Sequence, residues 1–135
     1  HFIWRDPRHI LAWSNQPSYG KRFYLFEDGG EARVEVVGLD VMKQDGHCSY
    51  LPGNEWILND TYPGSDRMQR PYLFHVRSGG VTPLGEFLSP KQYSGRWRCD
   101  THPRYSPDGR SVVIDSPTAE SGRQLHLIDI SRIVA

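Results

Sequence analysis

Three histidines stand at the start of three similar segments, and histidine is the side chain best suited to proton transfer and metal binding near neutral pH. The segments open with His1-Phe-Ile-Trp4, His47-Cys-Ser-Tyr50 and His102-Pro-Arg-Tyr105, so each has a histidine, two residues and an aromatic residue. If the segments fold alike, the three imidazoles will converge on one place, where they could move protons or hold a metal ion. The alternative is a purely structural role, in which each histidine starts an inner strand and hydrogen-bonds a neighbouring repeat.

The elements that must position these histidines repeat as well. Each opening is followed by a turn and an apolar run, and a further strand-like segment begins at Tyr24, Tyr72 and His126, at nearly equal distances from its histidine. Four short antiparallel strands in a unit of this length are typical of a propeller blade, and no segment has a sustained helical period. We therefore predict an all-β chain with almost no helix.

More specifically, the repeats predict a β-propeller fragment of about three four-stranded blades, with the last blade incomplete. The blades are expected at about residues 1–45, 46–100 and 101–135, which form one segment over residues 1–135. Three blades are too few to close a ring, because propellers usually have about four to eight. The chain is thus expected to be part of a larger propeller, completed by blades of the same or another chain.

The composition limits which kinds of partner and which cellular compartment are expected. The chain has 16 basic and 16 acidic residues, a balance that argues against an electrostatic platform for nucleic acid. No apolar run approaches the roughly 20 residues that a membrane helix needs, so no membrane partner is expected either. The two cysteines favour free thiols over one disulfide. Because the sequence starts with His1 in a strand-like segment, we expect a fragment or a processed product. No signal peptide is visible, so we expect a bacterial cytoplasmic protein, with the periplasm as the alternative.

Three stretches, GHCSYLPGNEWILNDTY (46–62), DRMQRPYLF (66–74) and WRCDTHPRYSPDGR (97–110), carry a resemblance to a known family. They resemble the last blades of oligogalacturonate lyases, within the broader class of Tol-Pal and prolyl-oligopeptidase propellers. The resemblance implies a seven-bladed propeller that cleaves pectin-derived oligosaccharides by β-elimination. It also implies a divalent metal, typically manganese, held by three histidines and a glutamine. By position, it makes His47 and His102 metal ligands, His1 the catalytic base and Arg98 a substrate-binding residue.

The sequence departs from that family at two ligand positions. Where the family resembles Gln-x-x-His-x-His, this chain has Cys99, His102 and Arg104. A guanidinium cannot ligate a cation, but it can bind a sugar carboxylate, so Arg104 is assigned to substrate binding. Cys99 is assigned to the residues that surround the histidines without binding the metal. If it did bind the metal, its sulfur would favour a softer ion such as zinc.

Two further residues of the same stretch complete the predicted site. Trp97 is expected to stack on a sugar ring, and Asp100 is expected either to orient the His102 imidazole or to cap the start of the strand. Residues 60–62 and 66–70 are assigned to one long loop, for which a solvated, ion-pairing role is favoured and a functional role is the alternative.

Two functions remain open at this point. The first is a lyase-like propeller acting on uronate-containing, acidic oligosaccharides, with the isolated segment inactive because other blades carry required residues. The alternative is a non-catalytic propeller module that binds a protein, a peptide or a sugar.

Overall fold

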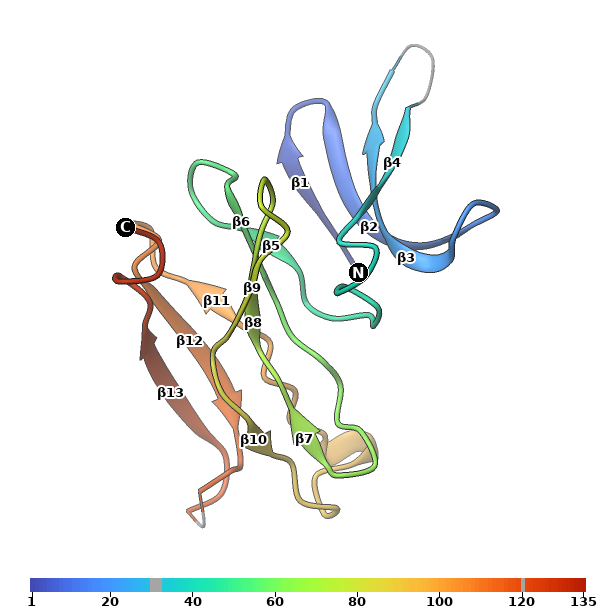
Figure 1. The fold of residues 1–135 in the computed structure, drawn as a ribbon. Helices are drawn as coiled ribbons and strands as arrows, with labels where there is room; N and C mark the ends of the chain where they lie inside the picture. Colours follow the sequence, from blue (N-terminus) through green and yellow to red (C-terminus); the bar gives the residue numbers. More distant parts are fainter. Residues whose placement is uncertain (30–32, 120) are drawn as a thin grey trace.

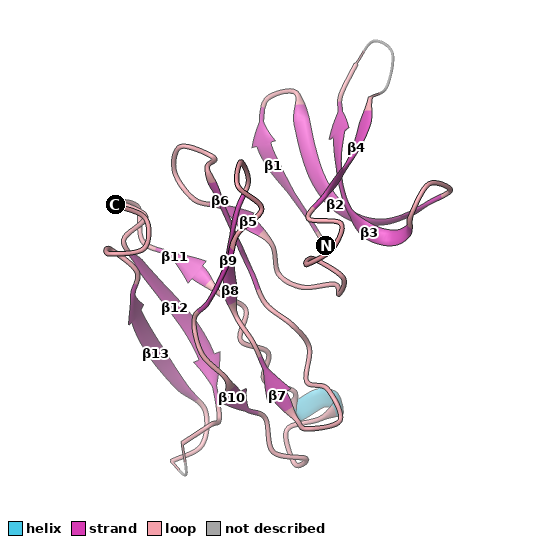
Figure 2. Cartoon of the chain, viewed as in Figure 1, coloured by secondary structure: helices cyan, strands magenta, loops and turns pink. Residues whose placement is uncertain are grey.

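The computed structural model describes residues 1–29, 33–119 and 121–135, and it is an all-β structure. Strands follow one another along the whole chain, and a single turn of 3-10 helix, η1 (Gly95–Trp97), is the one helical element in these ranges (Figures 1 and 2). The prediction of an all-β chain with almost no helix is thereby confirmed. In the part of the chain that the structure describes, no helix has the length and apolar character needed to cross a bilayer.

The first sheet is an antiparallel meander of four strands. It contains β1 (Phe2–Asp6), β2 (His9–Gln16), β3 (Gly20–Glu27) and β4 (Val34–Val37), in the order β1-β2-β3-β4. Gly20 begins β3 with a φ of 67°, a left-handed conformation that glycine adopts without strain and that lets the chain reverse after Pro17. The pairing of β1 with β2 is irregular between Trp4 and Asp6.

The second sheet lies next in the chain and also has four strands. It contains β5 (Ser49–Tyr50), β6 (Trp56–Asn59), β8 (Tyr72–His75) and β9 (Val81–Pro83), in the order β5-β6-β8-β9. The chain does not continue as one strand through residues 81–87, because Gly85, with a φ of 140°, turns it away after Pro83. The residues beyond it form β10 (Phe87–Leu88), which pairs with β7 (Met68–Gln69) in a separate two-stranded sheet.

The third sheet has three strands, as the repeat predicted for the last segment. It contains β11 (Arg104–Tyr105), β12 (Ser111–Ser116) and β13 (Gln124–Asp129), paired antiparallel in that order. The turn between β11 and β12 is closed by a hydrogen bond from the Gly109 N–H to the Ser106 carbonyl oxygen. Gly109 has a φ of 70°, so the Ser-Pro-Asp-Gly sequence supplies the left-handed residue that this turn requires.

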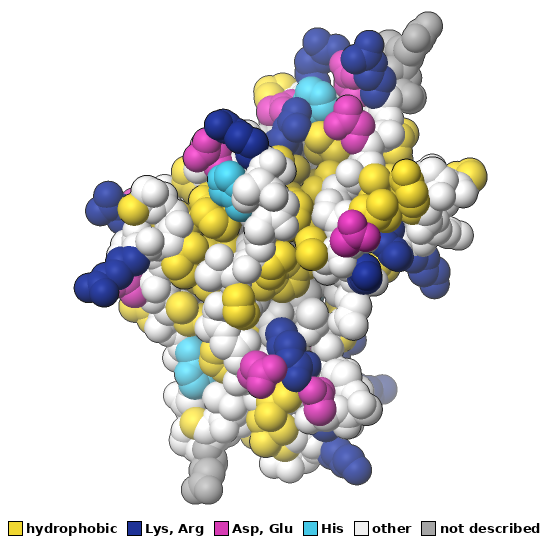
Figure 3. Space-filling model, viewed as in Figure 1, with side chains coloured by type: hydrophobic (Ala, Val, Ile, Leu, Met, Phe, Trp, Pro, Cys, Tyr) yellow, Lys and Arg dark blue, Asp and Glu magenta, His cyan; other side chains and the backbone are white. Residues whose placement is uncertain are grey.

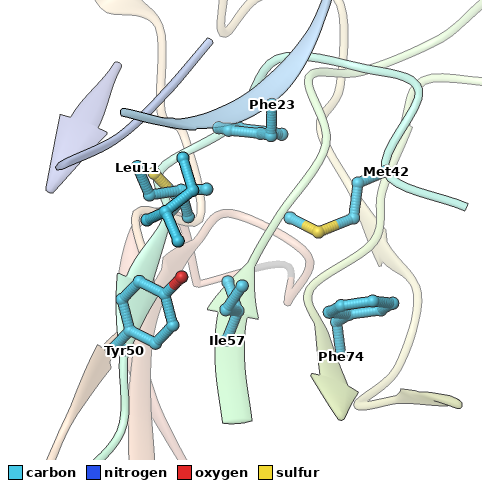
Figure 4. Packing of buried hydrophobic residues seen from close by; sticks show 8 residues of the cluster. Leu11, Phe23, Met42, Tyr50, Ile57 and Phe74 are labelled. Atoms are coloured by element: carbon cyan, nitrogen blue, oxygen red, sulfur yellow. The ribbon is translucent and has the colours of Figure 1, made fainter. Parts of the chain in front are cut away.

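The three larger sheets stack in chain order, with the second sheet in the middle (Figure 1). One core fills the space between the first and second sheets; it includes Leu11, Phe23, Met42, Tyr50, Ile57 and Phe74 (Figure 4). The other core lies between the second and third sheets; it includes Leu51, Leu58, Leu73, Val112, Ile114 and Ile130. Both faces of the second sheet are therefore buried, whereas the first and third sheets each have one face packed inside the chain.

Candidate functional site

The three aligned histidines form a row of rings contributed by three different sheets. His1 directly precedes β1, and His47 and His102 stand two residues before β5 and β11. The ring centroids of His1 and His47 are 4.6 Å apart, and those of His47 and His102 are 4.4 Å apart. In both pairs the interplanar angle is 62°, so each ring meets its neighbour edge to face. The convergence that the repeat predicted is present, and it follows from the stacking of the sheets.

A buried carboxylate, Asp60, fixes the centre of this row. Asp60 follows β6, is only 2% exposed, and accepts hydrogen bonds from the Nδ1 of His47 (3.1 Å) and the hydroxyl of Thr101 (2.5 Å). It also accepts the backbone N–H groups of His47 at 2.7 Å and of His102 at 3.1 Å. His102 has a φ of 38°, a left-handed conformation that costs a non-glycine residue roughly 1–3 kcal/mol. Asp60 therefore joins the second and third sheets and holds a strained residue in place.

The interpretation of Asp60 as part of a solvated loop is wrong, because its carboxylate is enclosed by the segments that it binds. Gly46 allows the backbone before His47 to lie close to Asp60, because a Cβ atom at this position would collide with the Asp60 carbonyl oxygen. The register of β5 and β6 accounts for this contact: Ser49 pairs with Leu58, and continuing the antiparallel register by two residues places His47 opposite Asp60.

His1 has a carboxylate partner of its own, at the more open end of the row. Its Nδ1 lies 2.9 Å from Oδ1 of Asp45, and the two side chains are 34% and 31% exposed. An Nδ1–H donated to Asp45 leaves the Nε2 of His1 as the free acceptor nitrogen. The Tyr62 hydroxyl lies 3.4 Å from this Nε2, and the Tyr62 ring is 6.1 Å from His1 and 5.7 Å from His47. Tyr62 belongs to the loop that the sequence analysis had assigned to solvent.

Charge around the row favours the protonated form of its central histidine. Burial alone would lower the pKa of His47, but the hydrogen bond and charge of Asp60, with the charges of Asp100 and Asp45, outweigh it, so the pKa is raised. Burial would raise the pKa of Asp60, but the hydrogen bonds from His47 and Thr101 lower it. His47 and Asp60 thus form a buried ion pair in which each partner stabilises the charge of the other.

Arg98 and Asp100 lie beside the row and pair with each other. The Nε of Arg98 is 2.8 Å from Oδ2 of Asp100, and its guanidinium carbon is 5.5 Å from the centre of the Tyr62 ring. Burial and the charges of Asp100 and Asp45 raise the pKa of Tyr62, although Arg98 acts in the opposite direction. Asp100, expected to orient His102, makes its ion pair with Arg98, while the carboxylate that bonds to the His102 backbone is that of Asp60.

The remaining predicted residues lie away from the row or beneath it. Trp97 is 71% exposed, and its carbonyl oxygen accepts a hydrogen bond from Arg123 at 2.6 Å. Arg104 lies in β11 opposite Val113 and pairs with Asp115 at 2.9 Å, and no described hydrogen bond or ion pair joins it to the histidines. Cys99 is buried, and burial raises the pKa of its thiol. Cys99 and Cys48 are both free thiols, as predicted.

The family resemblance implies a metal ion held by His47 and His102. Within residues 1–29, 33–119 and 121–135, no three His, Cys, Asp or Glu side chains are grouped so that they could hold a metal ion. The Nδ1 atoms of His1 and His47 are already engaged by Asp45 and Asp60. Metal-bound histidines commonly make the same carboxylate contact through their second nitrogen, so the divalent metal at His47 and His102 stays a prediction.

A groove of about 530 Å³ adjoins the row through Tyr62. Its walls come from the linker before β5, the loop after β6, and strands β8 and β9; they include Val41, Lys43, Tyr62, Arg70, Tyr72 and Pro83. Arg70 is neutralised by Asp66 at 2.6 Å and Glu86 at 2.7 Å, whereas exposed Lys43 has no ion pair among the described residues. In the space-filling view, hydrophobic side chains reach the surface in the middle of the face where β9 lies (Figure 3).

Comparison with protein-family models, with curated proteins and with solved structures gives no match to this chain.

Proposed function

We propose that this chain is a segment of a β-propeller whose histidine row binds uronate-containing oligosaccharides for β-elimination. The observation that carries the proposal is the row itself: three stacked sheets each contribute one histidine from the start of the first strand, with ring centroids 4.4 and 4.6 Å apart. Propeller blades place the starts of their inner strands around one central channel, and the stacking found here supports that arrangement. Further blades, from the same or another chain, would complete the ring.

His1 is the residue best suited to act as the base. β-Elimination removes the proton at C5 of a uronate, and the electron pair of that C–H bond forms the C4=C5 double bond while the C4–O bond breaks. With Nδ1–H donated to Asp45 at 2.9 Å, the Nε2 of His1 can accept the C5 proton. The Tyr62 hydroxyl, 3.4 Å from the same Nε2, stands where it could protonate the departing oxygen.

The central histidine supplies positive charge for the substrate carboxylate. Charge develops on that carboxylate as the C5 proton leaves, and a nearby cation stabilises it. The raised pKa of His47 favours the imidazolium form, and the guanidinium carbon of Arg98 lies 5.5 Å from the centre of the Tyr62 ring. Since Asp45, Asp60 and Asp100 also face the row, an anionic sugar should bind more tightly below the raised pKa of His47, where the imidazolium is formed, than above it.

The groove beside Tyr62 gives a place for the rest of an oligosaccharide. Its apolar wall includes the ring of Tyr72, which suits the face of a sugar, and Lys43 offers a charge for the carboxylate of a second uronate. Oligomers of several uronates should therefore bind better than a single uronate, whose contacts end at the row.

The proposal is tested by titrating the chain with trigalacturonate while the imidazole resonances are followed by NMR. We expect shifts at His1, His47 and His102 and none at His75, which bonds to Ser78 outside the row. A neutral trisaccharide of glucose provides the matched ligand control. Absence of any shift with uronate oligomers at pH 5 would contradict a uronate site.

Catalysis is then followed separately by the ultraviolet absorption of the unsaturated product, in the chain and in the assembly that contains the further blades. We expect His1→Gln to lower the rate by about 100-fold or more, whereas His75→Gln leaves it unchanged. Binding without product in the complete assembly would favour the alternative, a non-catalytic sugar-binding module.

A further inference from the structure

The ion pair between Arg98 and Asp100 joins a covered carboxylate to an exposed guanidinium. The Asp100 side chain is 13% exposed and that of Arg98 is 57% exposed, with 2.8 Å between Oδ2 and Nε. An ion pair between two exposed side chains contributes little, because two mobile groups must be held in one geometry. Here the carboxylate is already fixed by its surroundings, so it can set the position of the arginine that extends from it into solvent.

The backbone on both sides of Asp100 is anchored beneath the histidine row. Its neighbours Cys99 and Thr101 are both buried. The Thr101 hydroxyl donates a hydrogen bond to Oδ2 of Asp60, and the Thr101 carbonyl oxygen accepts the backbone N–H of Asp115 at 2.9 Å. Asp100 therefore extends from a segment that is joined both to the third sheet and to the carboxylate at the centre of the row.

Tyr62 provides a second contact for the guanidinium and connects it with the row. The guanidinium carbon of Arg98 lies 5.5 Å from the centre of the Tyr62 ring, a distance at which cation and ring attract each other. The hydroxyl of the same ring lies 3.4 Å from Nε2 of His1. Because the contact with Asp100 is made through Nε, the edge formed by the two terminal nitrogens of Arg98 remains for a carboxylate ligand.

We propose that Asp100 is a positioning residue that, through Arg98, makes the site selective for an ionised uronate over a neutral sugar. β-Elimination requires a cation beside the carboxylate on the carbon that loses its proton, and a guanidinium binds a carboxylate with two parallel hydrogen bonds. Asp100 keeps this guanidinium beside Tyr62, and Tyr62 also contacts His1, the proposed base. The selectivity rests on the proposed uronate site, but the contact between Asp100 and Arg98 does not.

This role predicts the opposite sign from a simple count of charges. Removal of the negative charge of Asp100 would by itself strengthen the binding of an anion. If Asp100 positions Arg98, Asp100→Asn should instead weaken the binding of trigalacturonate about tenfold, because the bidentate partner of a carboxylate is lost. Titration calorimetry at about pH 5 measures this affinity, because the His47 imidazolium is formed at that pH in both proteins.

Arg98→Ala shows whether the loss depends on the arginine. In that background Asp100→Asn should no longer weaken binding, because no guanidinium remains to be positioned. The trimethyl ester of trigalacturonate, which has no carboxylate, should bind equally to the unmodified chain and to Asp100→Asn. An unchanged or tighter affinity of Asp100→Asn for trigalacturonate would overturn the proposal, and so would equal losses with and without Arg98.

The matched control is Glu27→Gln, because Glu27 and Arg8 form an ion pair of the same kind. Their side chains are 21% and 69% exposed, with 2.8 Å between Oε1 and Nη2. The pair lies at the far end of the first sheet, where Glu27 is opposite His9, whereas His1 precedes the other end of β1. Glu27→Gln should therefore leave the affinity for trigalacturonate unchanged.

The position of Arg98 is also followed without any sugar, by the NMR signal of its Nε–H group. This proton should exchange slowly with water in the unmodified chain and in Glu27→Gln, and quickly in Asp100→Asn. Circular dichroism should show the same sheet content in all three proteins. An Arg98 signal that is unchanged in Asp100→Asn would overturn the positioning role, whether or not the sugar binds. Loss of the signal in this variant, with no uronate binding by the unmodified chain, would support that role and contradict the proposed function.

Discussion

Two histidine–aspartate pairs lie side by side in the row, and burial separates their roles. His47 and Asp60 are 13% and 2% exposed, whereas His1 and Asp45 are 34% and 31% exposed. Asp60 also binds two backbone N–H groups and a hydroxyl, whereas Asp45 also accepts the N–H of the adjacent Gly46. The buried pair thus connects sheets, while the open pair leaves the Nε2 of His1 accessible to a ligand.

The comparison indicates that a His–Asp contact alone does not identify a catalytic group. A buried carboxylate with four donors is an anchor, and its loss leaves polar groups unsatisfied inside the protein. A carboxylate at the surface can orient an imidazole at little cost in stability. We therefore assign an anchoring role to His47 and Asp60, in addition to the charge proposed for His47, and we propose proton transfer for His1 alone. Three measurements on variants can test this division.

The largest effect on the free energy of unfolding is expected when the Asp60 carboxylate is removed. Asp60→Ala should lower the free energy of unfolding by about 3 kcal/mol, because it breaks a buried ion pair and frees the strained His102 segment. The matched variant Asp45→Ala should lower it by less than about 1 kcal/mol. Urea denaturation followed by tryptophan fluorescence measures both values. Equal losses for the two variants would show that the pairs do not differ in the way their burial suggests.

A smaller effect is expected from pH acting on the buried pair. Because the pKa of His47 is raised from 6.5, the stabilisation that it contributes is complete below that value and is lost as the pH rises through the raised pKa. Because the pKa of Asp60 is lowered from 3.8, its contribution is present above that value and is lost as the pH falls through the lowered pKa. The pair therefore stabilises the fold most between about pH 4 and pH 6.5.

Unfolding free energies of the unmodified chain and of Asp60→Ala, compared at pH 5.5 and pH 9, test this window. The difference between the two proteins should be larger at pH 5.5. A difference that does not change with pH would mean that Asp60 acts through its backbone hydrogen bonds and not through the charge of His47.

Much of the fold follows from short-range patterns in the sequence. The opening motif, the apolar run and the next strand recur at nearly constant spacing, and sheets of antiparallel hairpins form from such local contacts. The break after Pro83 and the pairing of β10 with β7 were not predicted, because a strand over residues 81–87 and a strand interrupted at Gly85 have similar local propensities. The choice between them depends on Met68 and Gln69, which lie far away in the sequence.

The site was only partly predictable for a related reason. The three histidines could be found because they occupy one position of the repeat, and equivalent positions converge when sheets stack. Asp60 stands 13 residues after His47, as Asp115 stands 13 residues after His102, so the repeat could not show which carboxylate is buried beside the row. Tyr62 has no aromatic counterpart in the other segments, and contacts between sheets place the side chains of Asp60 and Tyr62. Arg104 had been placed by resemblance, but the alternation along β11 sets it opposite Val113, beside Asp115.

The smallest effect concerns how far the open pair influences the buried one. Asp60 contributes most to the raised pKa of His47, Asp100 less, and Asp45 least, because Asp45 bonds to the more distant end of the row. Asp100→Asn should therefore lower the pKa of His47 by more than Asp45→Asn, and both changes should be smaller than that in Asp60→Asn. Titration of the His47 imidazole by NMR measures the three values against the unmodified chain. If Asp45→Asn lowered the pKa as much as Asp100→Asn, the two pairs would titrate as one network. The proposed base, His1, could not then be tuned independently of the anchor at His47.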